Sequence, residues 1–93
     1  MYALSFDMVT SDLQQHYGEP YNSAYYEIKR ILANYDFYWV QGSTYITDAD
    51  NLKNLFMAIE ALKQIDWFRK SVRDIRGYRV EEWSDFTDIV KEK

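Results

Sequence analysis

The sequence has no cysteine, one histidine and one proline. The lack of cysteine excludes disulfides, thiolate metal sites and catalysis by a cysteine nucleophile. With only His16, acid–base catalysis by a histidine pair within one chain is also excluded, and we expect this residue at the surface. No apolar run approaches the roughly 20 residues of a transmembrane helix, and no secretory leader is visible. We therefore expect a cytoplasmic protein without contact to a membrane.

Apolar and aromatic residues are abundant instead. Hydrophobic residues make up 47% of the 93 residues, and nine tyrosines are among the aromatics, which is too apolar for a disordered chain. The length predicts a single domain over residues 1–93. A domain of this size has a modest core and often gains stability from a partner chain.

Charge is distributed unevenly along the chain. Residues 69–79 contain five basic side chains and one acid, which gives this segment a net charge of +4. Because the whole chain has a net charge of −4, the remaining residues carry −8. A basic segment on an acidic body is compatible with a local phosphate-binding site. The commoner explanation of such a run is a solvated strand that pairs with acidic neighbours. Charge alone therefore favours the structural interpretation.

Residues 2–9 read as a β-strand with Asp7 near its end. Bulky Leu4, Phe6 and Met8 alternate with small or charged side chains, which is the period of two of a strand. Packing explains Asp7 poorly, because Asp is depleted in strands and a buried carboxylate needs a partner. We therefore take Asp7 as the candidate functional centre.

Apolar spacing and turn residues predict the remaining elements. They are a loop or irregular helical turn (10–20), a helix (21–35), a hairpin (37–47, turn at 41–43), a helix (about 50–66), a short turn (67–71), a strand (72–80) and a final short helix (84–90). Asp48 or Asp50 is expected to cap the second long helix and Ser84 the last one. In that last helix we expect apolar side chains to pack on the domain.

This order of elements predicts an α+β protein with the ferredoxin-like βαββαβ fold, two layers and a short C-terminal helix. The sheet is then antiparallel with strand order 4-1-3-2, and both long helices lie on one face. Because the first strand is central, the N-terminal ends of the third and fourth strands lie beside its C-terminal end. The topology therefore gathers Asp7, Ser43 and Asp74, with Arg73 or Arg76, at one edge of the sheet.

The helix-free face of this sheet predicts a homodimer. It carries the small residues Ala3 and Ser5 together with aromatic side chains from the hairpin, and the chain has too few helices to cover it. Packing this face on a second copy would bury the aromatic side chains and bring two Asp7 residues together across a twofold axis.

Four separate segments resemble the VapD family, the virulence-associated protein D family of bacteria. They read MYALSFD (1–7), WVQGSTY (39–45), SVRDIR (71–76) and WSDFT (83–87). The resemblance runs end to end and implies a small, homodimeric ribonuclease of the ferredoxin-like fold, similar to the small CRISPR-associated nuclease subunit. Some family members are toxins of toxin–antitoxin pairs that cleave RNA and are restrained by a small antitoxin protein.

The resemblance also implies roles for individual residues. The strand-one Asp of the family maps to Asp7, its hairpin Ser to Ser43 and its strand-four Asp to Asp74. Asp7 would then act as a general base or as a ligand of Mg²⁺, with the need for a metal left open. Ser43 could donate a hydrogen bond to a phosphate oxygen. Asp74 could orient an arginine or serve as a second acid.

RNA contacts are expected from the basic and aromatic residues nearby. Arg73, Arg76 and Lys70 could offset phosphate charge, and the Tyr45 ring could stack on an unpaired base.

Each of these residues also has a purely structural interpretation. Asp7 could be a carboxylate paired with Arg73 or Arg76, Asp74 could be only an arginine partner, and Ser43 could be a turn residue. The aromatic side chains could be core or dimer packing. The alternative function is a non-catalytic dimeric module of the same fold that binds nucleic acid or protein.

Overall fold

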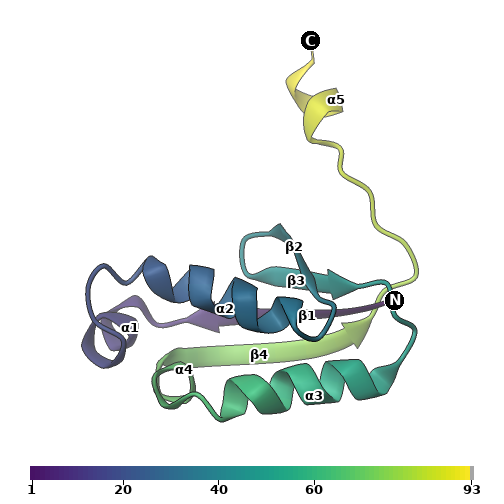
Figure 1. The fold of residues 1–93 in the computed structure, drawn as a ribbon. Helices are drawn as coiled ribbons and strands as arrows, with labels where there is room; N and C mark the ends of the chain where they lie inside the picture. Colours follow the sequence, from purple (N-terminus) through teal and green to yellow (C-terminus); the bar gives the residue numbers. More distant parts are fainter. Residues whose placement is uncertain (93) are drawn as a thin grey trace.

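The computed structural model describes residues 1–92 and contains one four-stranded antiparallel sheet in the order β2-β3-β1-β4 (Figure 1). Its strands are β1 (Tyr2–Met8), β2 (Tyr38–Gln41), β3 (Thr44–Thr47) and β4 (Val72–Arg79). Counted from the opposite edge this order is 4-1-3-2, so the predicted ferredoxin-like α+β fold is confirmed. β1 is central and antiparallel to both of its neighbours.

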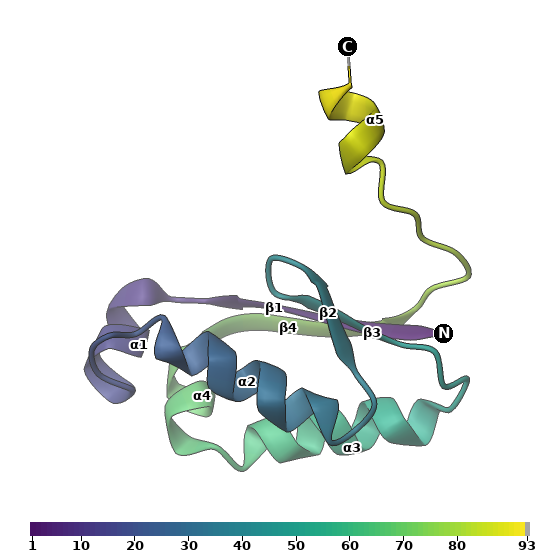
Figure 2. The same cartoon turned by 45° about the horizontal axis from the view of Figure 1, so that its top comes forward.

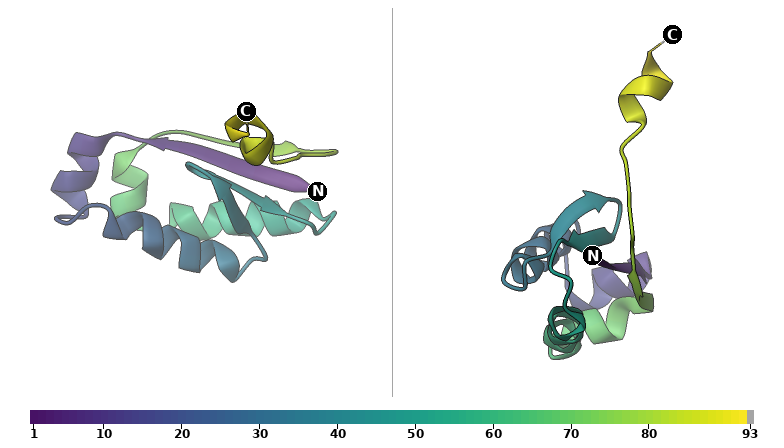
Figure 3. Two further views of the ribbon diagram at one scale, coloured as in Figure 1. Left: turned by 90° about the horizontal axis from the view of Figure 1, so that it is seen from above. Right: turned by 90° about the vertical axis from the view of Figure 1, so that its right-hand side faces the viewer.

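Helices cover one face of the sheet and leave the other open (Figures 1 and 2). On the covered face lie α1 (Thr10–His16), α2 (Ser23–Ala33), α3 (Leu52–Lys63) and α4 (Asp66–Ser71), while α5 (Thr87–Lys91) follows β4 and lies apart from them. The two long helices α2 and α3 lie along the sheet, while α1 packs against α4 beyond the C-terminal end of β1 (Figure 3). The helix-free face is called the open face below.

The core forms between the sheet and the long helices, as the alternation in β1 predicts. Leu4, Phe6 and Met8 are buried against it, while Asp7 on the other face is exposed. Ile28 of α2 and Leu62 of α3 are fully buried on the opposing layer. The period of two in β1 and the period of 3.6 in the helices thus converge on one core.

Two segments expected to be irregular are helices. The predicted loop or irregular turn at 10–20 contains the regular helix α1, and the predicted turn at 67–71 is part of α4. Each helix buries one apolar side chain, Leu13 in α1 and Phe68 in α4. The Phe68 ring meets Phe6 of β1 edge-on, with ring centroids 5.5 Å apart. Helices this short have little intrinsic stability, so tertiary burial decides their conformation.

The start of α3 differs from the predicted cap. Asn51, not Asp48 or Asp50, caps the helix, and its side-chain oxygen accepts a hydrogen bond from the Lys53 backbone N–H at 2.9 Å. Asn is as good a cap as Asp. Asp48 instead accepts a hydrogen bond from the Tyr38 hydroxyl at 3.2 Å.

The hydroxyl of Ser71, at the end of α4, is buried without a hydrogen-bond partner among residues 1–92. A buried polar group without a partner is destabilising. We expect Ser71→Ala to raise the free energy of unfolding by about 0.5–1 kcal/mol, measured by urea denaturation. Ser11→Ala on α1, which is exposed, controls for the higher helix propensity of alanine. A clear loss of stability in Ser71→Ala alone would contradict this.

The C-terminal arm (residues 81–92) does not pack as predicted. The arm leaves the sheet after β4 and projects away from the domain, with α5 at its end (Figures 1 and 3). Phe86, Ile89 and Val90 are 62%, 66% and 78% exposed. α5 begins at Thr87 rather than near Ser84. The expectation that these side chains pack on their own domain is therefore wrong.

Within residues 1–92, no helix combines the length and the apolar content that crossing a membrane requires.

Candidate active site

The register of the sheet places two carboxylates side by side. Asp7 of β1 is paired directly with Asp74 of β4, and both side chains point from the open face at one end of the sheet. Ser43 lies beside the same end, because its carbonyl oxygen accepts a hydrogen bond from the Phe6 backbone N–H at 3.2 Å. The predicted gathering of these residues, which are far apart in the sequence, follows from the strand order.

An irregularity in β4 brings Arg73 to Asp7. Asp7 pairs with Asp74 and the next residue, Met8, pairs with Val72, so Arg73 is the extra residue of a β-bulge. In a regular strand, Arg73 would point to the face opposite Asp74. A bulge re-aims the side chain of its extra residue. Here the Arg73 guanidinium donates a hydrogen bond to the Asp7 carboxylate at 3.1 Å.

The second carboxylate has its own arginine. The Arg76 Nε–H donates to Asp74 at 3.0 Å. The result is a pair of carboxylates, each held by one guanidinium. The Asp7 side chain is 60% exposed and that of Arg73 is 62% exposed. An exposed ion pair adds little to folding stability, and its carboxylate stays open to a ligand.

Lys70 and Tyr45 both contact other side chains of the described residues. The Lys70 ammonium pairs with Asp66 of the same helix at 3.0 Å, and this hydrogen bond lowers the pKa of the Asp66 carboxyl. Tyr45 is only 3% exposed and its ring packs on Phe6 with centroids 6.1 Å apart. The expectation that Tyr45 stacks on a base is therefore wrong, because its ring belongs to the core.

Ser43 lines a groove on the α2 side of the sheet. The groove lies between α2 and the hairpin and has a volume of about 580 Å³. It is called the aromatic groove here and is lined by Asn22, Tyr25, Tyr26, Lys29, Trp39, Gly42, Ser43 and Tyr45. Sequence reasoning missed this groove. Its signal is the exposed Tyr26 beside Tyr25 on α2 and a tryptophan three residues before the turn glycine.

Among residues 1–92, no group of three or more His, Asp or Glu side chains is arranged to hold a metal ion. Asp7 and Asp74 supply two carboxylates, which are ligands that Mg²⁺ accepts. Mg²⁺ usually keeps several waters and takes one or two protein carboxylates plus substrate phosphates. The carboxylate pair therefore fits a Mg²⁺ ion that is bound together with a substrate phosphate.

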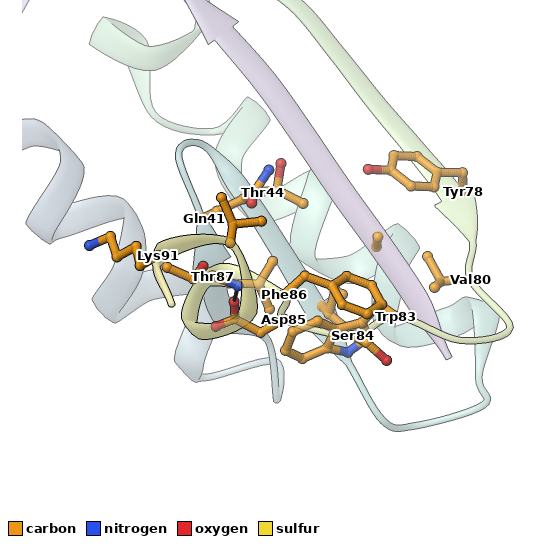
Figure 4. A pocket seen from close by; sticks show the side chains of 14 residues that line it. Gln41, Thr44, Tyr78, Val80, Trp83, Ser84, Asp85, Phe86, Thr87 and Lys91 are labelled. Atoms are coloured by element: carbon orange, nitrogen blue, oxygen red, sulfur yellow. Dashed lines mark hydrogen bonds between the residues drawn. The ribbon is translucent and has the colours of Figure 1, made fainter. Parts of the chain in front are cut away.

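A hollow separates the C-terminal arm from the open face (Figure 4). Its volume is about 730 Å³. Side chains of the sheet, among them Ala3, Ile46 and Tyr78, form one wall, and Trp83 and Phe86 of the arm form the other. Most of the lining is apolar or aromatic, so one chain leaves a partly apolar surface without a partner.

Comparison with known proteins fits this geometry. Residues 1–88 match the family model of CRISPR associated protein Cas2. The chain is 54% identical to endoribonuclease VapD of Dichelobacter nodosus over 98% of both chains. It is 50% identical to endoribonuclease VapD of Helicobacter pylori, over 98% of this chain and 99% of the relative. The resemblance of the four segments is confirmed, and the chain belongs to the VapD endoribonucleases within the family that the Cas2 model describes.

Proposed function

We propose that this protein is an endoribonuclease that cleaves single-stranded RNA, with Asp7 as its catalytic carboxylate. The observation that carries the proposal is the exposed pair of Asp7 and Asp74, each held by an arginine at the end of the sheet. Relatives at 45–54% identity over nearly the whole chain are named endoribonuclease VapD, which supports the reaction class.

Cleavage of a phosphodiester needs an activated oxygen nucleophile, a proton for the leaving oxygen and compensation of phosphate charge. In this proposal, an Asp7 oxygen accepts the proton of the attacking oxygen. Arg73 contacts both Asp7 and a phosphate oxygen, for which its planar fork of donors is suited. Asp74 orients Arg76 toward the same phosphate. If Mg²⁺ takes part, Asp7 and Asp74 are the side chains that would hold it, and it would supply further charge compensation.

Two copies of the chain complete the proposed site. The open face has a partly apolar hollow and the C-terminal arm has exposed apolar side chains, so these two surfaces could pack against each other in a homodimer. Docking the arm of one copy into the hollow of the other would cover both. A twofold arrangement would bring two Asp7 residues near each other, so that one could act as base and the other as acid.

The proposal extends to the biological setting. The enzyme would act on RNA in the cytoplasm as the toxin of a toxin–antitoxin pair, restrained by a small antitoxin protein. The name of the H. pylori relative, endoribonuclease VapD, supports the enzymatic part only.

The test is incubation of the purified protein with end-labelled single-stranded RNA, duplex RNA and single-stranded DNA, with and without EDTA. Cleavage of the single-stranded RNA at internal positions supports the proposal. Loss of cleavage in EDTA assigns a metal-assisted mechanism, and retention assigns acid–base catalysis by side chains. Tight binding of RNA without cleavage would instead support the non-catalytic module.

The Arg73 side chain offers a graded test of phosphate recognition. We expect Arg73→Ala to lower kcat/KM about 10- to 100-fold, because a charged hydrogen bond to the phosphate is lost. Arg73→Lys keeps the charge without the planar fork, so its kcat/KM should lie between those of the wild type and Arg73→Ala. Arg69→Ala, which removes an arginine paired with Asp66, is the matched control and should change kcat/KM by less than twofold. Equal rates for wild type and Arg73→Ala would exclude this role.

A further inference from the structure

The aromatic groove carries an inference that rests on the proposed RNA cleavage and extends it. We propose that the groove binds one unpaired nucleobase of the RNA, stacked on Trp39, and that it thereby selects which nucleotide lies next to Asp7. The groove lies between α2 and the β2–β3 hairpin, which are neighbours in Figure 2. Its volume of about 580 Å³ is within the usual range for small-ligand sites.

Trp39 is the stacking platform. The indole is 49% exposed, although tryptophan is highly buried on average. Its Nε1–H donates to the Gly42 carbonyl oxygen at 2.7 Å, which fixes the ring against the hairpin turn. An exposed ring held in one orientation binds a flat partner with little loss of conformational freedom.

Charge favours a nucleotide over an acidic or apolar occupant. Lys29 is the one charged side chain among the described residues that line the groove, in a protein of net charge −4. Its ammonium lies 5.7 Å from the centroid of the Trp39 ring. The flexible lysine can exchange this contact for a phosphate, while the ring it leaves becomes free for a base.

The groove also contains polar groups that could form hydrogen bonds with the edge of a nucleobase. Asn22, Tyr25 and Ser43 carry amide or hydroxyl groups that can both donate and accept hydrogen bonds, as recognition of a base edge requires. Tyr45 forms the buried apolar floor rather than a platform. A single aromatic platform, one cation and hydrogen-bonding groups are the parts from which single-stranded RNA sites are built.

The groove lies at the same end of the sheet as the carboxylate pair, but on the side that the helices cover. Ser43 lines it, and the Ser43 carbonyl accepts the hydrogen bond of Phe6, the neighbour of Asp7. A nucleotide on Trp39 would therefore place an adjacent phosphate toward Asp7.

The experiment uses the full-length chain with Asp7→Asn, so that binding is measured without cleavage. A fluorescein-labelled 12-nucleotide RNA is titrated, and the same RNA is prepared with an abasic site at each position in turn. We expect Trp39→Ala to weaken binding about 5- to 100-fold and Trp39→Phe to weaken it less. The abasic site that weakens binding to the parent should have no further effect in Trp39→Ala.

Phe56→Ala is the matched control, because it removes an exposed aromatic side chain from α3, outside the groove. It should bind RNA as the parent does. Unchanged binding by Trp39→Ala, with a melting temperature equal to that of Trp39→Phe, would overturn the proposal and leave the groove to another occupant such as a protein segment. Trp39-dependent binding in a protein that never cleaves RNA would support the groove and refute the proposed enzymatic function.

Discussion

Replacing Asp7 by Asn is expected to lower the rate of RNA cleavage by about 10²- to 10⁴-fold, the range for loss of a general base. The amide keeps the size of the side chain but cannot accept the proton of the attacking oxygen. It also cannot hold Mg²⁺ as a carboxylate does, so a large loss is expected with or without a metal. Initial rates on end-labelled single-stranded RNA, under single-turnover conditions, measure the effect.

The fold should survive this substitution. Asp7 is exposed and its ion pair with Arg73 lies at the surface, where such pairs contribute little stability. Asp66→Asn breaks an equally exposed aspartate–arginine pair outside the site, and it should keep its cleavage rate within twofold. Equal cleavage by wild type and Asp7→Asn would point to a contaminating nuclease and refute the catalytic role of Asp7.

The environment of Asp7 could be predicted largely from the sequence. The alternation in β1 fixes which side chains face the helices, and the order of elements fixes which strands flank β1. These two constraints together place Asp74 beside Asp7, although the two residues are far apart in the chain. The prediction succeeded because it depended on strand order and direction, which the whole chain determines.

The contact between Arg73 and Asp7 could be predicted only as one of two alternatives. A β-bulge adds one residue to a strand and leaves no periodic signal, so the sequence could not decide between Arg73 and Arg76 as the partner. The face of the hairpin that Tyr45 occupies was equally ambiguous, because apolar side chains occur on both faces of residues 37–47. The aromatic groove was missed for this reason.

The C-terminal arm illustrates a different limit. Phe86, Ile89 and Val90 have the spacing of three and four that predicts burial of one helix face. Periodicity shows that a face needs a partner but not whether the partner is in the same chain. In the structure this face is exposed. The arm does not fill the hollow between itself and the open face of its own chain. The surface left without a partner is what favours the homodimer.

Introducing charge on this face of the arm is expected to dissociate the proposed dimer. Burial of an Ile or Val side chain contributes about 1.5–3 kcal/mol, so losing Ile89 and Val90 removes several kcal/mol from each arm. We expect Ile89→Asp combined with Val90→Asp to weaken dimerisation by at least about 100-fold. Light scattering on a size-exclusion column, from 1 to 100 µM protein, would then detect a monomer for the double variant and the expected dimer for the wild type.

A control on the same helix separates apolar contact from charge. Asp88→Asn and Lys91→Ala change the charge of α5 without removing an apolar side chain, and both should remain dimeric. A monomeric wild type, or a double variant that stays dimeric, would contradict the proposed assembly.

If the two Asp7 residues divide the base and acid roles, the monomeric double variant must also lose RNA cleavage, although its own Asp7, Asp74 and Arg73 are unchanged. Retained cleavage by this monomer would assign the complete site to one chain and limit the arm to assembly.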